Sequence, residues 1–242
     1  MKLHRPLAGE VKTLTLKNEG GKWYACFSCI VDAEPLPLNE SVVGMDVGLE
    51  SFALTRDAEI VDHPRYDQRA QKELRPRQRH GSRCMQRSSG WRKACRLAAK
   101  LHRHVLNQRN DFQHQVAGEL AKHYGLIVVE DLNVQGLAGG RLAKSVPDAA
   151  WSSFIAKLPD KAESADRVLV RVDPRGTSQQ CPCGKPAPKK LWNRLRQCSW
   201  GPNTTRDHAS ALEILRCGLR LRTETPALAG VALKAPRFSD GA

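Results

Sequence analysis

The pattern of hydrophobic and polar positions predicts a set of short strands. Residues 11–32 (VKTLTLKNEGGKWYACFSCIVD) are rich in β-branched and aromatic residues, and NEGG between their halves is a hairpin turn signal. Residues 42–55 form a mostly apolar run broken by one acid and a glycine, and residues 125–134 and 168–173 are further apolar segments. Apolar strands of this kind are typically covered on both faces. We therefore expect a buried sheet in which residues 125–134 form a central strand.

In the long polar stretch at residues 65–124, apolar residues recur at steps of three and four, as on one face of a helix. Its apolar stripe consists of Ala94, Leu97, Ala98, Leu101, Val105, Phe112, Val116 and Leu120. Pro76 and the SSG at 88–90 interrupt the first half of the stretch, which predicts two helices in a hairpin.

Two further helices are predicted after the central strand. One covers residues 149–165 and is interrupted by Pro159; the other covers residues 206–219, with Thr205 as its cap. Strands mixed with helices in this order predict an α/β fold.

The net charge of the chain indicates a function for the helical hairpin. Lys and Arg number 39 against 25 Asp and Glu, which gives a formal net charge of +14, and only 5% of residues are aromatic. Such an excess favours a polyanionic partner, most often nucleic acid, bound through its backbone rather than by base stacking. The polar face of the hairpin carries Arg92, Lys93, Arg96, Lys100, Arg103 and Arg109. The alternative is a basic surface that only keeps the protein in solution.

The sequence has no apolar run long enough to span a membrane, and its start, MKLHRPLAGEVK, is unlike a signal peptide. Its eight cysteines are scattered, unlike a disulfide framework, so a reducing cytoplasm is expected. Cys26 and Cys29 match C-x-x-C, but residues three apart on a strand face opposite sides of the sheet. We interpret them as small core residues.

Three acids occupy element positions next to the apolar strands. Asp46 lies within GMDVGL, Glu130 ends IVVE, and Asp207 falls in the first turn of the last helix, where the dipole favours a carboxylate. Unpaired buried carboxylates are costly, and a divalent cation such as Mg²⁺ or Mn²⁺ offsets that cost. Two such ions can activate water and stabilise the leaving oxygen of a phosphodiester. The spacing alone suggests this chemistry without specifying it.

Several motifs in order resemble a known family. They are GGKWYACFSC, VGMDVGLESFAL, RNDFQHQVAGEL, IVVEDLNVQGL, LAKSVPDAAW, VDPRGTSQQCPCG and RDHASALEIL, which together cover roughly residues 10–220. The chain resembles TnpB (OrfB), the transposon-encoded, RNA-guided nucleases related to type V CRISPR effectors. The resemblance implies a RuvC-like nuclease domain of RNase H fold. It also implies catalytic carboxylates at Asp46, Glu130 and Asp207 that bind two Mg²⁺ and cleave DNA paired with, or displaced by, a guide RNA. The order Asp–Glu–Asp argues against the DDE transposases, whose last acid is Glu.

The resemblance further implies a domain organisation. Residues 1–40 would be the closing strands of a truncated, wedge-like β-barrel. Residues 41–175 would form the RuvC-like domain with its basic helical hairpin, and residues 176–203 would form a zinc-ribbon-like insertion. The final RuvC helix would cover 204–222 and a loose tail 223–242. In RNDFQH, Arg109, Asp111 and His114 would lie on the helix that lines the nucleic-acid channel.

The zinc ribbon implied by the resemblance departs from the family pattern. Cys181 and Cys183 stand for its first cysteine pair and Cys198 begins the second, whereas Trp200–Gly201 occupies the place of the fourth ligand. Structural zinc sites use four ligands, so a site with three thiolates is incomplete. We expect a degenerate ribbon with Zn²⁺ in doubt, and His208 or Cys217 as alternative fourth ligands.

Three functions follow from these observations. The first is a metal-dependent, RNA-guided DNA endonuclease, favoured by the intact acids. The second is a truncated, catalytically inactive remnant that binds nucleic acid, favoured by the degenerate ribbon and the expected truncation. The third is a guide-independent nuclease acting on structured DNA. Nothing in the sequence replaces the RNA- and target-binding surface that the expected truncation would remove.

Overall fold

The computed structural model describes residues 6–19, 21–32, 35–132, 150–177, 180, 195–198 and 201–224, with only the backbone for 195–198 and 201–204. The chain divides into two compact units, each of which is described by itself. Unit 1 comprises residues 1–34 and 66–112; unit 2 comprises residues 35–65 and 113–242.

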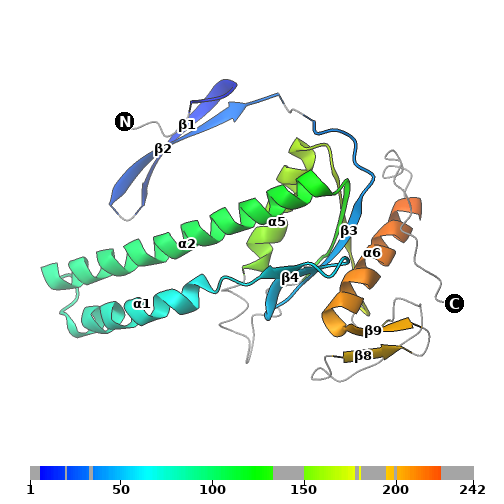
Figure 1. Ribbon diagram of the computed structural model, residues 1–242. Helices are drawn as coiled ribbons and strands as arrows, with labels where there is room; N and C mark the ends of the chain where they lie inside the picture. Colours follow the sequence, from blue (N-terminus) through cyan, green and yellow to red (C-terminus); the bar gives the residue numbers. More distant parts are fainter. Residues whose placement is uncertain are drawn as a thin grey trace. The chain divides into compact units, whose positions relative to one another are not determined.

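In unit 1, the predicted N-terminal hairpin is confirmed. Strands β1 (Glu10–Glu19) and β2 (Lys22–Ile30) pair antiparallel, and Gly21 at the turn has a φ of 82° (Figure 1). The register places Leu14 opposite Phe27 and Leu16 opposite Ala25, so one face of the hairpin is apolar.

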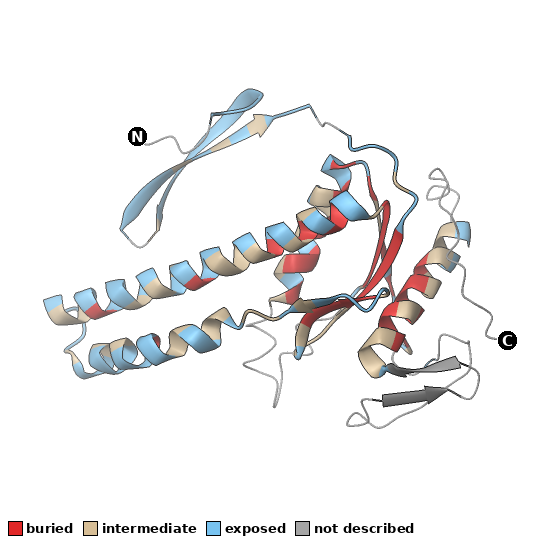
Figure 2. Cartoon of the chain, in the orientation of Figure 1, coloured by how far each residue is buried: buried red, intermediate tan, exposed pale blue. Residues whose placement is uncertain are grey.

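Most of that hairpin is exposed to solvent, which corrects the prediction for its cysteines. Cys26 is exposed and Cys29 is half-buried, on a hairpin that Figure 2 shows to be largely exposed, so neither is a core residue. Two strands alone cannot enclose a core, and the burial expected for these residues needs a second layer.

The predicted helical hairpin is confirmed, but its first interruption is wrong. Helix α1 (Tyr66–Arg83) continues through Pro76, and the chain breaks only before α2 (Ser89–His123), whose last part belongs to unit 2. Pro76 is exposed. Water can therefore satisfy the carbonyl that the missing N–H leaves unpaired, which lowers the cost of a proline inside the helix.

The core of unit 2 is a five-stranded mixed sheet in the order β5-β4-β3-β6-β7. Its strands are β3 (Val42–Val47), β4 (Ser51–Thr55), β5 (Ile60–Asp62), β6 (Leu126–Glu130) and β7 (Val168–Val172). The first three in the chain pair antiparallel, whereas β6 pairs parallel with both β3 and β7. The α/β class is thus confirmed, as is the interior position of the strand predicted within residues 125–134, which is β6.

Helix α6 (Arg206–Glu224) covers one face of this sheet (Figure 1). It forms a core with alternate residues of three strands, and these buried residues are Val42, Leu126, Val128, Val170, Val172, Ile214 and Leu215. Figure 2 shows the buried residues of α6 turned toward the buried strands.

Helix α5 (Trp151–Ser164) packs against β7 and is not interrupted at Pro159, contrary to the prediction. A proline at 159 cannot donate to the carbonyl of Ile155 four residues earlier. Arg171 Nη2 donates to that oxygen at 3.5 Å. A side chain of the adjacent strand therefore satisfies the group that the proline leaves unpaired.

Strands β8 (Leu195–Cys198) and β9 (Gly201–Thr205) form a separate antiparallel pair just before α6. Over the described residues, we find no helix with the length and apolar character needed to cross a bilayer.

Candidate functional site

Two of the predicted acids lie side by side because of strand register. Strands β3 and β6 run parallel, with Gly44 opposite Val128 and Met45 opposite Val129. Continuing this register by one residue brings Asp46 opposite Glu130. Since alternate residues of a strand face the same side, Asp46 shares a face with Gly44, and Glu130 shares one with Val128.

Two glycines bring α6 onto that same face. A Cβ on Gly44 would lie 2.3 Å from the Ala211 carbonyl oxygen, and a Cβ on Gly218 would lie 2.4 Å from Cγ1 of Val128. Helix α6 therefore approaches β3 and β6 too closely for any side chain at either glycine. Asp207 lies one turn before Ala211, at the end of α6 that is nearer to Asp46.

The start of α6 is fixed as the sequence predicts. The His208 backbone N–H donates to Thr205 Oγ1 at 3.3 Å, so Thr205 caps the helix. Asp207 then lies in the first turn, where the helix dipole favours its charge, and Arg206 Nε donates to its Oδ1 at 3.3 Å.

Burial and the charges of the two other acids both act on Asp46. Burial raises the pKa of Asp46 well above its usual value, and the charges of Glu130 and Asp207 raise it further. The Arg206 guanidinium and the Val47 backbone N–H oppose this rise in pKa. Asp46 and Glu130 are half-buried, so solvent still reaches both side chains. Placing a negative charge on Asp46 therefore costs free energy, and a bound cation would offset that cost.

Glu130 has a partner that the sequence did not reveal. Burial raises the pKa of Glu130, and a hydrogen bond donated by Thr177 Oγ1 to Glu130 Oε1 lowers it. Thr177 is itself buried, with 4% of its surface exposed, and follows β7 in the TSQQ stretch. No sequence pattern marks it, because its role depends on a contact between segments 47 residues apart.

This set of donors fits a hard divalent cation. Three carboxylates supply the oxygen ligands that Mg²⁺ and Mn²⁺ prefer, and such a cation would relieve the repulsion that Glu130 and Asp207 exert on Asp46. Within the described residues, no group of three or more His, Cys, Asp or Glu side chains is already gathered as a ligand set. The residues thus match the chemistry, although their side chains do not converge on a single point.

The predicted nucleic-acid-binding residues lie on α2. Arg92, Lys93, Arg96 and Lys100 are exposed, and Arg103 and Arg109 are half-buried. Arg103 Nη1 donates to the Glu19 carbonyl, so this side chain also joins α2 to the hairpin of unit 1. His114, in unit 2, is exposed.

Sequence reasoning overlooked a second basic helix beside them. Helix α1 carries Arg69, Lys72, Arg75, Arg79 and Arg83, all exposed. The signal was present in the excess of Lys and Arg over Asp and Glu at residues 65–83. We call the cations of α2 at four- and three-residue steps, Arg92, Arg96, Lys100 and Arg103, the α2 stripe.

The predicted zinc ligands lie mostly outside the described residues. Cys181 and Cys183 are not among those residues, and Cys198 is described only by its backbone, at the end of β8. The two alternative fourth ligands have other contacts. His208 Nε2 lies 2.7 Å from the Arg56 carbonyl oxygen, and the Cys217 thiol lies 3.6 Å from Glu213 Oε1.

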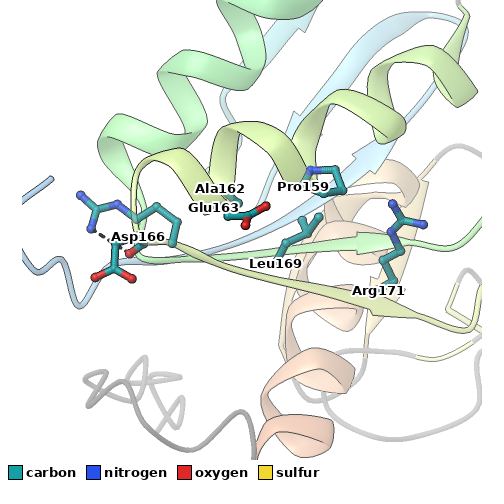
Figure 3. A pocket seen from close by; sticks show the side chains of 7 residues that line it. Pro159, Ala162, Glu163, Asp166, Leu169 and Arg171 are labelled. Atoms are coloured by element: carbon teal, nitrogen blue, oxygen red, sulfur yellow. Dashed lines mark hydrogen bonds between the residues drawn. The ribbon is translucent and has the colours of Figure 1, made fainter. Parts of the chain in front are cut away.

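A cavity of about 690 Å³ lies between β7 and α5 (Figure 3). Leu169 and Arg171 of β7 line it together with Pro159, Ala162 and Glu163 of α5. These β7 residues alternate with Val170 and Val172, which pack with α6. The cavity is therefore separated from Asp46 and Glu130 by the sheet itself.

Comparison with known proteins now decides the family. The profile of the IS605 OrfB family, described as a probable transposase, matches residues 15–141, and a Cas12f1-like TNB domain matches residues 151–214. The chain belongs to the IS605 OrfB (TnpB) family. The resemblance read from the sequence motifs is confirmed.

Curated members of the OrfB family carry functional names. A "Putative RNA-guided DNA endonuclease" of Streptomyces pristinaespiralis is 31% identical over 88% of this chain and 54% of its own length. "Putative RNA-guided DNA endonuclease InsQ" of Escherichia coli is 30% identical over 80% of this chain and 52% of its own length. The chain thus spans about half the length of the curated relatives it matches.

Solved structures agree with this OrfB assignment at the level of the fold. A Cas12f1–sgRNA–target DNA complex matches with a TM-score of 0.51 and 16% identity, over 84% of this chain and 55% of the other. A CRISPR–Cas12f ternary complex matches with a TM-score of 0.54 and 14% identity, over 80% and 41% of the two chains. The mixed α/β architecture is therefore Cas12f-like.

Proposed function

We propose that this chain carries the nuclease activity of an RNA-guided DNA endonuclease of the OrfB family, with Asp46, Glu130 and Asp207 as its catalytic carboxylates. The observation that supports this most is their common face. Strand register places two of them together, and the contacts of Gly44 and Gly218 bring the helix of the third onto the same side of the sheet.

The fold we propose for unit 2 is RNase H-like, of the RuvC type. A sheet of order β5-β4-β3-β6-β7, with three antiparallel strands followed by two parallel ones, supports this assignment. The β8–β9 pair before α6 would belong to the zinc-ribbon-like insertion, and the β1–β2 pair would be the hairpin of the wedge-like barrel.

In this proposal the three carboxylates would hold Mg²⁺, which would supply Lewis-acid stabilisation and an activated water for phosphodiester hydrolysis. The protein's own contribution is to hold the charges in place. Burial keeps Asp46 partly desolvated within reach of the charges of Glu130 and Asp207, and Arg206 pairs with Asp207. The exposed cations of α1 and the α2 stripe would bind the phosphate backbones of DNA and guide RNA.

The alternative is a protein that binds nucleic acid without cutting it. One observation favours it: the described residues hold no ready-formed ligand cluster. Binding through the basic helices does not require the acids, so the two functions separate experimentally.

The test combines purified protein, Mg²⁺, candidate guide RNA from the end of the encoding transposon, and DNA that matches the guide. A parallel reaction lacks the guide RNA. We expect guide-dependent cutting that Asp46→Ala or Glu130→Ala lowers about a thousandfold or more, with binding retained. Glu163→Ala is the matched control, because this carboxylate belongs to the same unit but lines the cavity on the opposite face. Binding without cutting in the unsubstituted protein supports the alternative, and cutting without guide supports a stand-alone nuclease.

A further inference from the structure

The loop after β7 is built to present one hydroxyl to the acid cluster. Arg175 N–H donates to Asp173 Oδ1 at 2.9 Å, and Gly176 has a φ of 87°, a conformation that glycine adopts without strain. The chain then turns so that the buried Thr177 directs its Oγ1 at Glu130 Oε1. The Pro174 carbonyl oxygen lies 3.0 Å from the same hydroxyl.

The far end of this loop is anchored to α6. Gln180 N–H donates to the Gly176 carbonyl at 3.0 Å, and Arg216 Nη2 donates to Gln180 Oε1 at 3.2 Å. Arg216 is held in turn by Glu213, a fully buried carboxylate of α6, through two bonds of 2.7 and 2.8 Å. A buried carboxylate needs such a partner, and a two-point contact also fixes the direction of the guanidinium.

We propose that Thr177 is a positioning residue for Glu130, and that the contacts Glu213–Arg216–Gln180 hold its loop in place. The inference rests on the proposed function, because it assigns Glu130 to a cation. The threonine hydroxyl fixes Oε1, while among the described residues no hydrogen bond is made to Oε2. The carboxylate thus keeps one oxygen for a cation and is held in one orientation before the cation arrives.

The effect of such a contact on metal affinity can be measured. Partners that orient a metal-binding side chain typically contribute 10- to 100-fold to metal affinity or activity. A purely structural threonine, by contrast, would change stability and leave the affinity of folded protein for metal unchanged. Metal affinity therefore separates the two roles.

The test measures Mn²⁺ binding by the loss of the free Mn²⁺ signal in electron paramagnetic resonance. The variants are Thr177→Val, which removes the hydroxyl at nearly constant volume, and Thr177→Ser, which keeps it. Ser164→Ala is the matched control, since that hydroxyl bonds only to a carbonyl of its own helix, at the exposed end of α5. We expect about tenfold weaker binding for Thr177→Val, recovery to within about threefold for Thr177→Ser, and no change for Ser164→Ala.

A Thr177→Val protein that folds and binds Mn²⁺ as tightly as the unsubstituted chain overturns the proposal. If Thr177→Val fails to fold, Gln180→Ala tests the proposal instead, because it removes the bond to Arg216 at an exposed residue. We expect two- to threefold weaker Mn²⁺ binding for this variant. Unchanged binding overturns the proposal.

The proposed function fails separately. If the unsubstituted protein binds Mn²⁺ in a Thr177-dependent way yet cuts no DNA under any condition, the positioning role stands and the nuclease assignment falls. If Glu130→Gln leaves Mn²⁺ binding unchanged, the cation site and the positioning role fall together.

Discussion

In unit 2 the acids lie against a packed sheet, whereas in unit 1 the cations lie on helices with few buried residues. The helical part of unit 1 buries Leu74, Ala94 and Val105 among the described residues, while α6 alone buries seven. Asp46, Glu130 and Asp207 are therefore held by backbone register and close packing, and the cations of α1 and α2 by the helix surface alone. Substitutions in the first region should act through geometry, and those in the second through charge.

The largest expected effect tests the packed region at Gly44. Gly44→Ala places a Cβ 2.3 Å from the Ala211 carbonyl oxygen and 2.6 Å from Leu215 Cβ, so α6 must move away from β3. We expect a loss of about 3 kcal/mol or more in the free energy of unfolding, measured by urea denaturation. Gly118→Ala is the control, because a Cβ on this glycine of α2 meets nothing within 4 Å. It should gain about 0.5–1 kcal/mol from helix propensity. A loss under about 1 kcal/mol at Gly44 would contradict the role of close packing.

The second prediction concerns the charge that this packing imposes on Asp46. Its pKa is raised in the folded protein above the ordinary value of 3.8, so the folded state binds the proton more tightly than the unfolded one. Stability therefore falls as the pH rises from 3.8 through the raised pKa, and the cost is fully present above it. In metal-free buffer, Asp46→Asn should raise the Tm at pH 7.5, and the difference should close as the pH falls below 3.8. A Tm difference that does not depend on pH would refute this.

A smaller effect is expected at the start of α6. Thr205→Ala removes the cap on the His208 N–H and should cost about 1 kcal/mol of unfolding free energy. Thr223→Ala, near the other end of the helix, removes an exposed hydroxyl that bonds back to the Arg220 carbonyl and should cost less than about 0.5 kcal/mol. Equal losses for the two variants would mean that the cap does not stabilise α6 selectively.

The smallest single effects are expected in unit 1. Each of Arg92→Gln, Arg96→Gln and Lys100→Gln should weaken DNA or RNA binding a few-fold and reduce the slope of log K against log salt by about 0.9. The three losses should add, since exposed side chains on a helix surface act independently. Fluorescence anisotropy over a salt series measures both quantities. Arg220→Gln, an exposed residue of α6, is the control and should leave the slope unchanged.

Local pattern accounts for much of what the sequence predicted. The apolar strands, the two-helix hairpin, the cap at Thr205 and the element positions of the three acids all follow from period, turn signals and charge. Each of these depends on residues close together in the chain, where side-chain direction and backbone preference decide the outcome.

What the sequence could not predict depends on contacts between distant segments. Pro159 is tolerated because Arg171 of the next strand reaches the orphaned carbonyl of Ile155. Thr177 finds Glu130 through a loop, and Gly44 and Gly218 matter only because α6 lies on β3 and β6. The exposure of Cys26 was missed for the same reason: a strand pattern does not say what covers the strand.

The close contacts at Gly44 and Gly218 also determine where Asp207 lies, because they fix the helix that carries it. Helix α6 is located by where it rests on β3 and β6, so these contacts set the position of Asp207 independently of the connection that precedes the helix. The Arg216–Gln180 bond and the Thr205 cap add two further contacts on the side of that connection. Close packing of the helix on the sheet thus keeps the third carboxylate on the face that carries the other two.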